Sequence, residues 1–310
     1  MAVKRRWVLF AQIAASIVFL GLVAVVARPA ELLRTVAKAN TWLVALSLAF
    51  VPAIMILRIS RWHLIARTRK ADIPFRDSYD SYMGGLAISV VAPWVAELAR
   101  GAFAAPTDKA GFVGLTFLDK LIDVTMLYVF ACAGLAVLAP GGYKIVAAAA
   151  IIPAVCAWLA ARPLVSLADR VLPRSKMAEA LRRAVTASRD VSPGVLGAAF
   201  ALAAVNVAVY YSQLYVIVYA FSPQIEAKAA GLFPLITLSR LVPSFGGLGV
   251  REFVAGALFA RFNYSVTSAA AVDAAFVQFV FANVVPAAVW LMTSGMLARL
   301  AARRQGELVD

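Results

Sequence analysis

The sequence predicts an all-α, polytopic integral membrane protein. Its 310 residues are 63% hydrophobic and only 15% charged. Apolar runs long enough to cross a bilayer recur along the whole chain, which a single soluble core of this size would not need. The longest polar interval, residues 162–193, is too short for an independently folded soluble domain of ordinary size. We therefore expect one transmembrane domain over residues 1–310.

Six apolar runs predict full transmembrane helices. The first run follows Lys4, Arg5 and Arg6, and it is longer than the apolar segment of a signal peptide, so we expect it to be retained. The other five also have lengths that suit a helix in a bilayer. The six predicted spans are residues 7–27, 41–57, 111–138, 145–163, 194–221 and 267–296.

Two further apolar stretches, residues 79–105 and 229–262, are interrupted. We expect each to form a broken, re-entrant-like helical hairpin that enters and leaves the membrane on one side. In the second stretch, Pro243 disfavours helix at the residue before it, and the glycines after it permit backbone angles that other residues resist. The first half-helix should therefore end at Val242, and a new helix should begin near Leu248.

The order of these elements predicts two inverted repeats. Residues 1–138 and residues 145–296 each run span, span, broken hairpin, span, but they begin on opposite sides of the membrane. Ser89–Pro93 and Ser239–Pro243 share a Ser-x-x-x-Pro pattern at equivalent places. In many transporters built from inverted repeats, broken helices at equivalent places mark a substrate site near mid-membrane. We expect such a site where the two hairpins meet.

The distribution of the 30 lysines and arginines predicts the orientation. Most of them lie on one side of the membrane if the N-terminus is cytoplasmic, as the positive-inside rule requires. The C-terminal tail, residues 297–310, is then cytoplasmic as well. Basic residues beside spans attract anionic lipid headgroups, so the net charge of +14 does not indicate nucleic-acid binding.

Charged residues around the first broken stretch are candidates for a polar pathway. Glu97 and Arg100 share a helical face, as do Asp119 and Asp123, whose like charges repel unless a cation joins them. Either Arg100 or Arg240 could be that cation. Because a charge at the bilayer centre costs about 2.5–3.5 kcal/mol on insertion scales, several such residues indicate a polar pathway or an interior ion-pair network. A salt bridge between helices at the membrane surface is the alternative.

The second broken stretch carries a candidate anion site. The helix that begins near Leu248 would present unpaired N–H groups and the positive end of its dipole, with Arg251 in its first turn. An anionic headgroup or a phosphate could bind there, and Glu252 could cap the same turn. A glycine-rich turn between packed helices, with both side chains at the water interface, is the alternative.

Arg58 and Arg61 form a third candidate, because they share a helical face after the second span. We expect both to lie at the membrane surface beside Trp62, where arginine can bind a phosphate through two hydrogen bonds. An ordinary positively charged flank explains the same pattern. The single histidine, and two cysteines that both lie in apolar runs, predict no metal site, and we expect no cofactor.

Four motifs carry a resemblance to a known family. They are Arg58-x-x-Arg61-Trp62; Pro93 with Glu97 and Arg100; Phe117-Leu118-Asp119-Lys120 with Asp123; and Pro243-x-x-Gly246-Gly247-Leu248-Gly249-Val250-Arg251-Glu252. Together they resemble the membrane domain of lysylphosphatidylglycerol synthase, a flippase-like family of bacterial and archaeal membrane proteins. The resemblance covers roughly residues 5–300. The chain departs from the family at Ala96, where glycine is usual, and at Asp119-Lys120, where Glu-Arg is usual.

The resemblance implies a protein of the bacterial inner membrane that moves a lipid with an anionic or aminoacylated headgroup, or that serves cell-envelope assembly. The implied partners are membrane lipids, a second copy of the chain or envelope-assembly proteins. The synthase also has a soluble aminoacyl-transferase domain, and this sequence, which ends at Asp310, contains none. We therefore expect that the chain does not charge lipids with lysine on its own.

The leading hypothesis is a lipid translocator. A membrane-embedded lipid-modifying enzyme, which would use the carboxylates as general bases or metal ligands, is one alternative. A non-transporting scaffold is the other. The sequence contains no catalytic signature, which favours a protein that is not an enzyme, and no residue is predicted to be catalytic. The predicted substrate-binding residues are Arg58, Arg61, Glu97, Arg100, Asp119, Lys120, Asp123, Arg240, Pro243, Gly246, Gly247, Gly249, Arg251 and Glu252.

Overall fold

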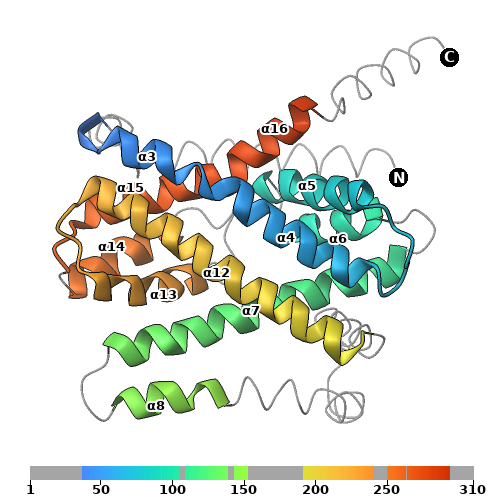
Figure 1. Ribbon diagram of the computed structural model, residues 1–310. Coiled ribbons are helices and arrows are strands. Elements are labelled where there is room, and N and C mark those ends of the chain that lie inside the picture. The colour runs from blue at the N-terminus through green and yellow to red at the C-terminus, as the bar shows by residue number, and fades with distance from the viewer. Residues whose placement is uncertain are drawn as a thin grey trace, which may run out of the picture.

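A computed structural model of the chain describes seven segments, and within them every regular element is a helix, as predicted (Figure 1). The long helices α4, α7 and α12 run side by side through the molecule, with α5 and α6 toward one end and α13 to α15 toward the other. The described residues are 37–91, 93–104, 109–138, 143–152, 191–239, 250–262 and 264–293. The predicted span at 7–27 and most of the one at 145–163 lie outside them.

Helices α3 (Thr41–Ser47) and α4 (Phe50–Ala66) form the first described span. The side chain of Asn40 caps α3 by accepting hydrogen bonds from the backbone N–H groups of residues 42 and 43. Pro52, in the first turn of α4, has no N–H for the carbonyl of Leu48, and its ring disfavours a continuous helix there. The chain therefore breaks between α3 and α4, although together they form one apolar span of 26 residues.

Helices α5 (Phe75–Val91) and α6 (Pro93–Ala104) form the first predicted hairpin and pack against each other. Proline is favourable at the first position of a helix, where its missing N–H removes no internal hydrogen bond. A Cβ atom added to Gly85 would lie 2.8 Å from the Cβ atom of Arg100, so glycine permits this close approach of the two helices. The hairpin places Arg100 beside α7 (Lys109–Leu138), which is followed by α8 (Tyr143–Ala149).

The second half begins with α12 (Pro193–Phe221), whose N-cap Ser192 accepts a hydrogen bond from the N–H of Val195. A 3-10 turn, η1 (Ala227–Leu232), leads into α13 (Phe233–Leu238), and α14 (Val250–Phe262) follows. The predicted break at Pro243, Gly246, Gly247 and Gly249 lies between α13 and α14, outside the described residues.

The last described span contains α15 (Ser268–Phe279), the π-helical turn η4 (Val280–Val284) and α16 (Val285–Thr293). A π turn holds an extra residue within an otherwise α-helical segment, and such turns are frequent at functional sites. Four described helical segments are long and apolar enough to cross a membrane, and they correspond to four of the six predicted spans. They are Thr41–Ala66, Gly111–Leu138, Pro193–Phe221 and Ser268–Thr293.

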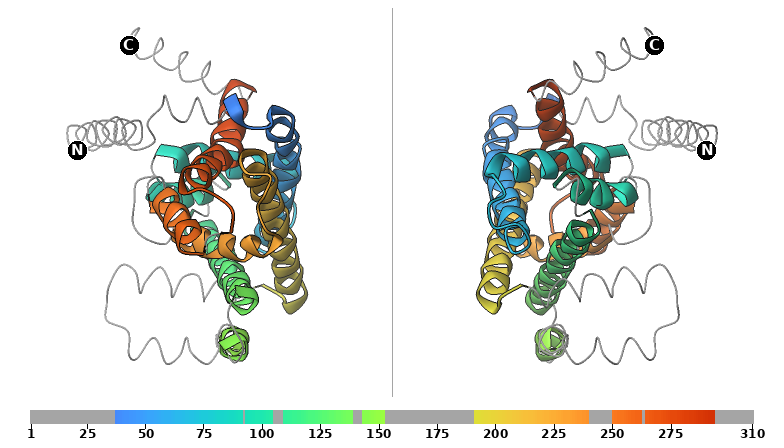
Figure 2. Two further views of the ribbon diagram at one scale, coloured as in Figure 1. Left: turned by 90° about the vertical axis from the view of Figure 1, so that its left-hand side faces the viewer. Right: turned by 90° about the vertical axis from the view of Figure 1, so that its right-hand side faces the viewer.

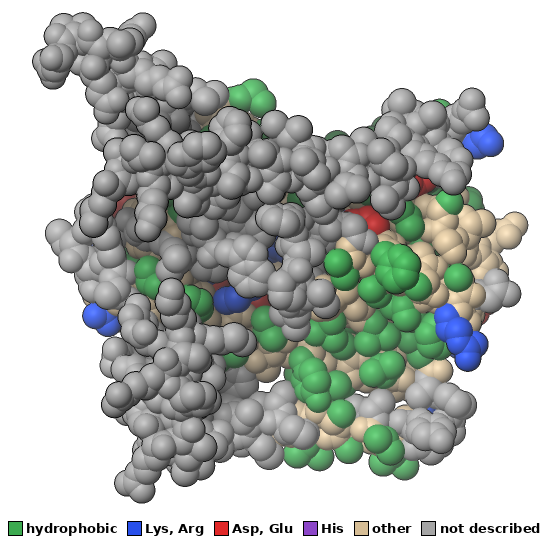
Figure 3. Space-filling model, turned by 180° about the vertical axis from the view of Figure 1, so that it is seen from behind, with side chains coloured by type: hydrophobic (Ala, Val, Ile, Leu, Met, Phe, Trp, Pro, Cys, Tyr) green, Lys and Arg blue, Asp and Glu red, His purple; other side chains and the backbone are tan. Residues whose placement is uncertain are grey.

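Packing joins the two halves around α12, which contacts α3, α4, α7, α13 and α15 (Figures 1 and 2). A second contact brings Gly134 of α7 against Gly231 of η1, where a Cβ atom added to Gly134 would lie 2.3 Å from the carbonyl oxygen of Gly231. On the face shown in Figure 3, hydrophobic side chains cover a broad part of the described surface, as expected for a membrane protein. The polar groups described below are therefore enclosed in an apolar bundle.

Candidate functional site

Four charged side chains from α4, α6 and α7 form an ionic cluster, which we define as Arg61, Arg100, Asp119 and Asp123. Nε of Arg61 lies 2.7 Å from Oδ1 of Asp119, and Nη1 of Arg61 lies 2.5 Å from Oδ1 of Asp123. Nη1 of Arg100 lies 2.8 Å from Oδ2 of Asp119. Two guanidinium groups thus face two carboxylates, and the cluster is neutral as a unit.

The ionic cluster is buried at one end and open at the other. The side chains of Arg61 and Asp119 are 1% and 0% exposed, whereas that of Asp123 is 38% exposed. The guanidinium carbon of Arg100 lies 4.8 Å from the centroid of the Trp62 ring, a cation–π distance. Buried ion pairs offset their desolvation only when their geometry is good, and here each carboxylate has at least one guanidinium group within 2.8 Å.

The cluster corrects two sequence-based expectations. A cation joins Asp119 and Asp123 as predicted, but the residue that contacts both is Arg61, while Arg100 contacts Asp119. Trp62 was expected at the membrane surface and is fully buried, because its ring packs against Phe112 of α7 and Arg100 of α6. The other expected cation, Arg240, lies outside the described residues.

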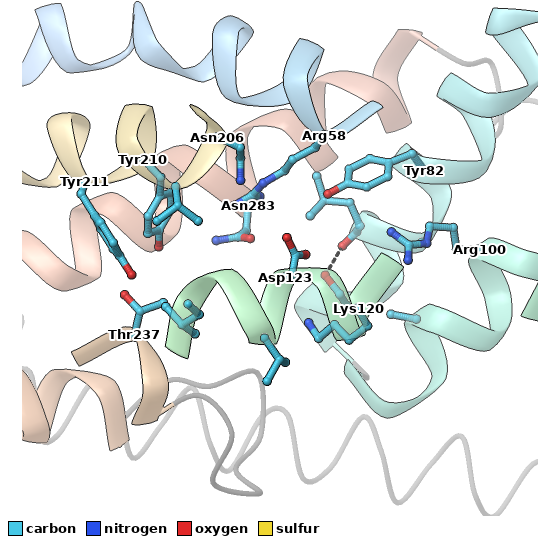
Figure 4. A pocket seen from close by; sticks show the side chains of 17 residues that line it. Arg58, Tyr82, Arg100, Lys120, Asp123, Asn206, Tyr210, Tyr211, Thr237 and Asn283 are labelled. Carbon is cyan, nitrogen blue, oxygen red and sulfur yellow. Dashed lines mark hydrogen bonds between the residues drawn. The ribbon is translucent and has the colours of Figure 1, made fainter. Parts of the chain in front are cut away.

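A cavity of about 230 Å³ opens beside the ionic cluster, between the first and second halves of the chain (Figure 4). Arg58 extends into it from α4, and Asp123 points toward Arg58 from α7. Helices α5, α6, α12, α13 and η4 complete the wall. The lining residues are Arg58, Tyr82, Gly85, Leu86, Ser89, Ala96, Arg100, Lys120, Asp123, Val124, Leu127, Asn206, Val207, Tyr210, Tyr211, Thr237 and Asn283.

Sequence reasoning missed the polar lining that the second half contributes. Asn206 and Tyr210 come from α12, Thr237 comes from α13, and Asn283 comes from the π turn η4. Asn206 and Asn283 were detectable, because each is an amide inside a long apolar run where a polar side chain is costly without a partner. Tyr210 gave no such signal, because tyrosine is common in apolar segments.

Arg58 differs from the arginines of the ionic cluster. It is half-buried, and its guanidinium carbon lies 5.6 Å from the centroid of the Tyr210 ring. Within the described part of the chain, Arg58 has no carboxylate at ion-pair distance. It therefore lies in the wall of the cavity.

Arg251 and Glu252 form a separate buried pair at the start of α14. Nη2 of Arg251 lies 2.9 Å from Oε1 of Glu252, and Arg251 also donates to the carbonyl of Ala275 in α15. Neither residue lines the cavity. Both are buried, so this pair fastens α14 to α15 and does not lie at a water interface. Asp273, in α15, is also buried.

The remaining predicted site residues are only partly described. Lys120 lines the cavity from α7. Glu97 belongs to α6, one turn before Arg100, and its side chain lies outside the described part of the structure. Residues 240–249, which include Pro243 and the predicted glycines, are likewise outside it. In the described segments, no three His, Cys, Asp or Glu side chains are grouped so that they could hold a metal ion.

The site is thus a small polar cavity inside an apolar bundle, lined by both cationic and hydrogen-bonding side chains. Residues 10–289 match a family model described as the lysylphosphatidylglycerol synthase TM region. No curated protein and no solved structure matches the chain. The family match covers most of the sequence and includes the whole ionic cluster and all the described residues that line the cavity. The chain therefore belongs to the lysylphosphatidylglycerol synthase TM region family, whose members are membrane proteins related to lipid modification or transport.

Proposed function

We propose that this protein translocates a membrane lipid, whose headgroup passes through the cavity while its acyl chains stay in the bilayer. The observation that carries the proposal is a polar cavity between the two halves of an otherwise apolar bundle. A headgroup that leaves water needs new partners, because a buried polar or charged group without partners is strongly unfavourable. The side chains of Arg58, Asp123 and Asn206 are placed to supply them.

Two members of the ionic cluster, Arg61 and Asp119, would serve as the fixed wall of this pathway. Arg61 and Asp119 are fully buried and held by several contacts, which restrict their movement. Arg100 and Lys120 extend from this wall to the cavity, on α6 and α7. Arg100 and Lys120, together with Glu97 on α6, form the proposed gate on the side of the first hairpin.

Alternating access would then follow from the two halves of the chain. The proposal retains six spans and two broken hairpins in inverted repeats, with both termini in the cytoplasm of a bacterium and the protein in its inner membrane. In this arrangement one half rocks against the other around a fixed site. Arg240 and the Gly246–Gly249 segment would then admit the headgroup from the second hairpin.

The proposal is tested with purified protein in vesicles that contain a lipid with a fluorescent acyl chain. Dithionite bleaches the outer leaflet, so translocation appears as continued loss of fluorescence beyond that leaflet. Val124→Trp fills the cavity from α7, and we expect it to abolish the continued loss of fluorescence beyond the outer leaflet. Val137→Trp is the matched control, because Val137 lies on the same helix, is 57% exposed and does not line the cavity.

The same vesicles separate the alternatives. Exchange between leaflets without a covalent change in the lipid supports translocation. A new lipid species in mass spectra would instead indicate a lipid-modifying enzyme, and the absence of both would favour a scaffold. Full exchange by the Val124→Trp protein would show that the headgroup does not pass through this cavity.

A further inference from the structure

We propose that the protein binds a small monovalent cation, for which Na⁺ is the probe, at the break between α3 and α4. The ligands are the side-chain carbonyl of Gln213 on α12 and the hydroxyl and backbone carbonyl oxygens of Ser47 at the end of α3. This region is apart from the cavity, because neither residue is among the described residues that line it. The proposal goes beyond the proposed function and does not depend on it.

Gln213 brings a buried acceptor without a partner to the break. Its side chain is 0% exposed, and Nε2 donates to the backbone carbonyl of Ser47 at 3.1 Å. That hydrogen bond anchors the amide group beside Ser47, which is also fully buried. The other end of the same amide, Oε1, is buried and has no hydrogen-bond partner within the described segments. A buried acceptor without a partner is unfavourable, so a ligand is expected there.

The groups around Oε1 of Gln213 favour a cation over a water molecule. Both side-chain donors at the break are already used, because Nε2 of Gln213 donates to Ser47, and Oγ of Ser47 donates to the carbonyl of Val44 at 2.6 Å. Backbone N–H groups of the break also donate to earlier carbonyls, and these are the groups of residues 48, 49 and 51. A buried water makes about three hydrogen bonds and needs a donor for its own oxygen. A cation needs only acceptors.

The break itself supplies partial negative charge. Helix α3 ends at Ser47, and the carbonyl groups at the C-terminal end of a helix carry the negative end of its dipole. No lysine or arginine occurs from residue 41 to residue 57 to offset that charge. In transporters, the carbonyl groups at helix breaks within the membrane coordinate Na⁺. The same kind of break is present here, with the oxygen of Gln213 facing it from α12.

The ligands limit the charge of the ion. Neither residues 41–57 nor α12 contains an aspartate or a glutamate. Sites for Mg²⁺ and Ca²⁺ normally include carboxylates, which offset the charge of the ion. Neutral carbonyl oxygens are instead the ligands of monovalent cations in membrane channels. The site therefore suits a small monovalent cation.

The site lies between helices that also form the cavity. Arg58 of α4 and Asn206 of α12 line that cavity, and Asn206 precedes Gln213 by about two turns on the same face of α12. A cation that joins Gln213 to Ser47 would therefore hold α12 against the broken span and keep this wall of the cavity in one arrangement.

The test uses the purified full-length protein in detergent, with thermal unfolding and binding of radioactive Na⁺ as the two measurements. Midpoints of unfolding are compared in NaCl and in choline chloride at equal concentration, because choline is too large for the site. Na⁺ at about 100 times its dissociation constant should raise the midpoint by about 3–8 °C. Binding of radioactive Na⁺ should be saturable.

Two substitutions of Gln213 test its role. Gln213→Leu should abolish saturable binding and the difference between the two midpoints. Gln213→Glu keeps the size of the side chain but places a carboxylate oxygen against the carbonyl of Ser47, and the two oxygens repel each other unless a cation lies between them. The Gln213→Glu protein should therefore unfold at a lower temperature in choline chloride and gain more from Na⁺ than the original protein. Ser212→Ala is the matched control, because Ser212 is the neighbouring residue on α12 and is exposed.

Two results would overturn the inference. Equal midpoints in both salts, without saturable binding, would mean that the Gln213 amide holds only water. A Na⁺ response that persists in the Gln213→Leu protein would place the ion elsewhere. Lipid exchange in vesicles does not enter this test, so the ion site can fail while translocation is correct, and it can be confirmed while translocation is wrong.

Discussion

Replacement of Asp119 by asparagine tests whether the ionic cluster stabilises the bundle. Asp119 is fully buried, and its carboxylate oxygens lie 2.7 Å from Nε of Arg61 and 2.8 Å from Nη1 of Arg100. Asparagine keeps the shape but removes the negative charge, so the cluster retains two guanidinium groups against the carboxylate of Asp123. Removal of one partner from a buried ion pair costs about 3–5 kcal/mol, because it leaves a charge without compensation. We expect the free energy of unfolding to fall by an amount in this range.

The measurement is equilibrium unfolding in mixed detergent micelles, followed by circular dichroism. A double variant that combines Asp119→Asn with Arg100→Gln retains the neutral pair of Arg61 and Asp123. The loss in the double variant should therefore be smaller than the sum of the single losses, by about 0.5–3 kcal/mol. Arg76→Gln removes an exposed cation from α5 and should change stability by less than about 0.5 kcal/mol. A loss below about 1 kcal/mol for Asp119→Asn, the level of a surface ion pair, or strict additivity in the double variant, would refute the reasoning.

Two further predictions concern contacts between the halves, and both use the same unfolding measurement. A side chain at Gly134 would collide with the carbonyl oxygen of Gly231, so Gly134→Leu should cost about 1–3 kcal/mol. Gly197→Ala is the control: a Cβ atom added there meets nothing within 4 Å, so the substitution should be neutral or stabilising. Equal stabilities of the Gly134→Leu and Gly197→Ala proteins would contradict the close contact of α7 with η1. Nε2 of Gln213 donates to the carbonyl of Ser47 at the break between α3 and α4, so Gln213→Leu should cost about 1–3 kcal/mol. An unchanged stability would show that the break does not need this hydrogen bond.

The long helices were predictable because length and apolarity alone identify a span. The run at residues 194–221 corresponds closely to α12. The end of α4 was not predictable in this way. Hydropathy ended the span at residue 57, since Arg58 and Arg61 follow, yet the helix continues to Ala66. The end of the helix remains packed because carboxylates from α7 neutralise Arg61. These carboxylates belong to Asp119 and Asp123, which lie 58 and 62 positions after Arg61 in the sequence.

The site was partly predictable for the same reason. Asp119 and Asp123 are four residues apart, so local spacing predicted a shared face and the need for a cation. The identity of that cation depends on how α4 packs against α7, which no local pattern reveals. The cavity residues of the second half are a different case. Asn206 and Asn283 stand out as amides in apolar runs, and only their convergence on Arg58 required the fold.

Because of the π turn at Val280–Val284, the last described span cannot lose a single residue without a change in its packing. Contacts hold the span at both ends: Arg251 binds the carbonyl of Ala275 before the turn, and the indole N–H of Trp290 donates to Asp80 after it. Each residue of an α-helix rotates the chain by about 100°. Excision of one residue from the turn would give a more regular helix, yet it would swing Trp290 away from Asp80 and could not preserve both attachments. A one-residue deletion here should thus be more damaging than most substitutions.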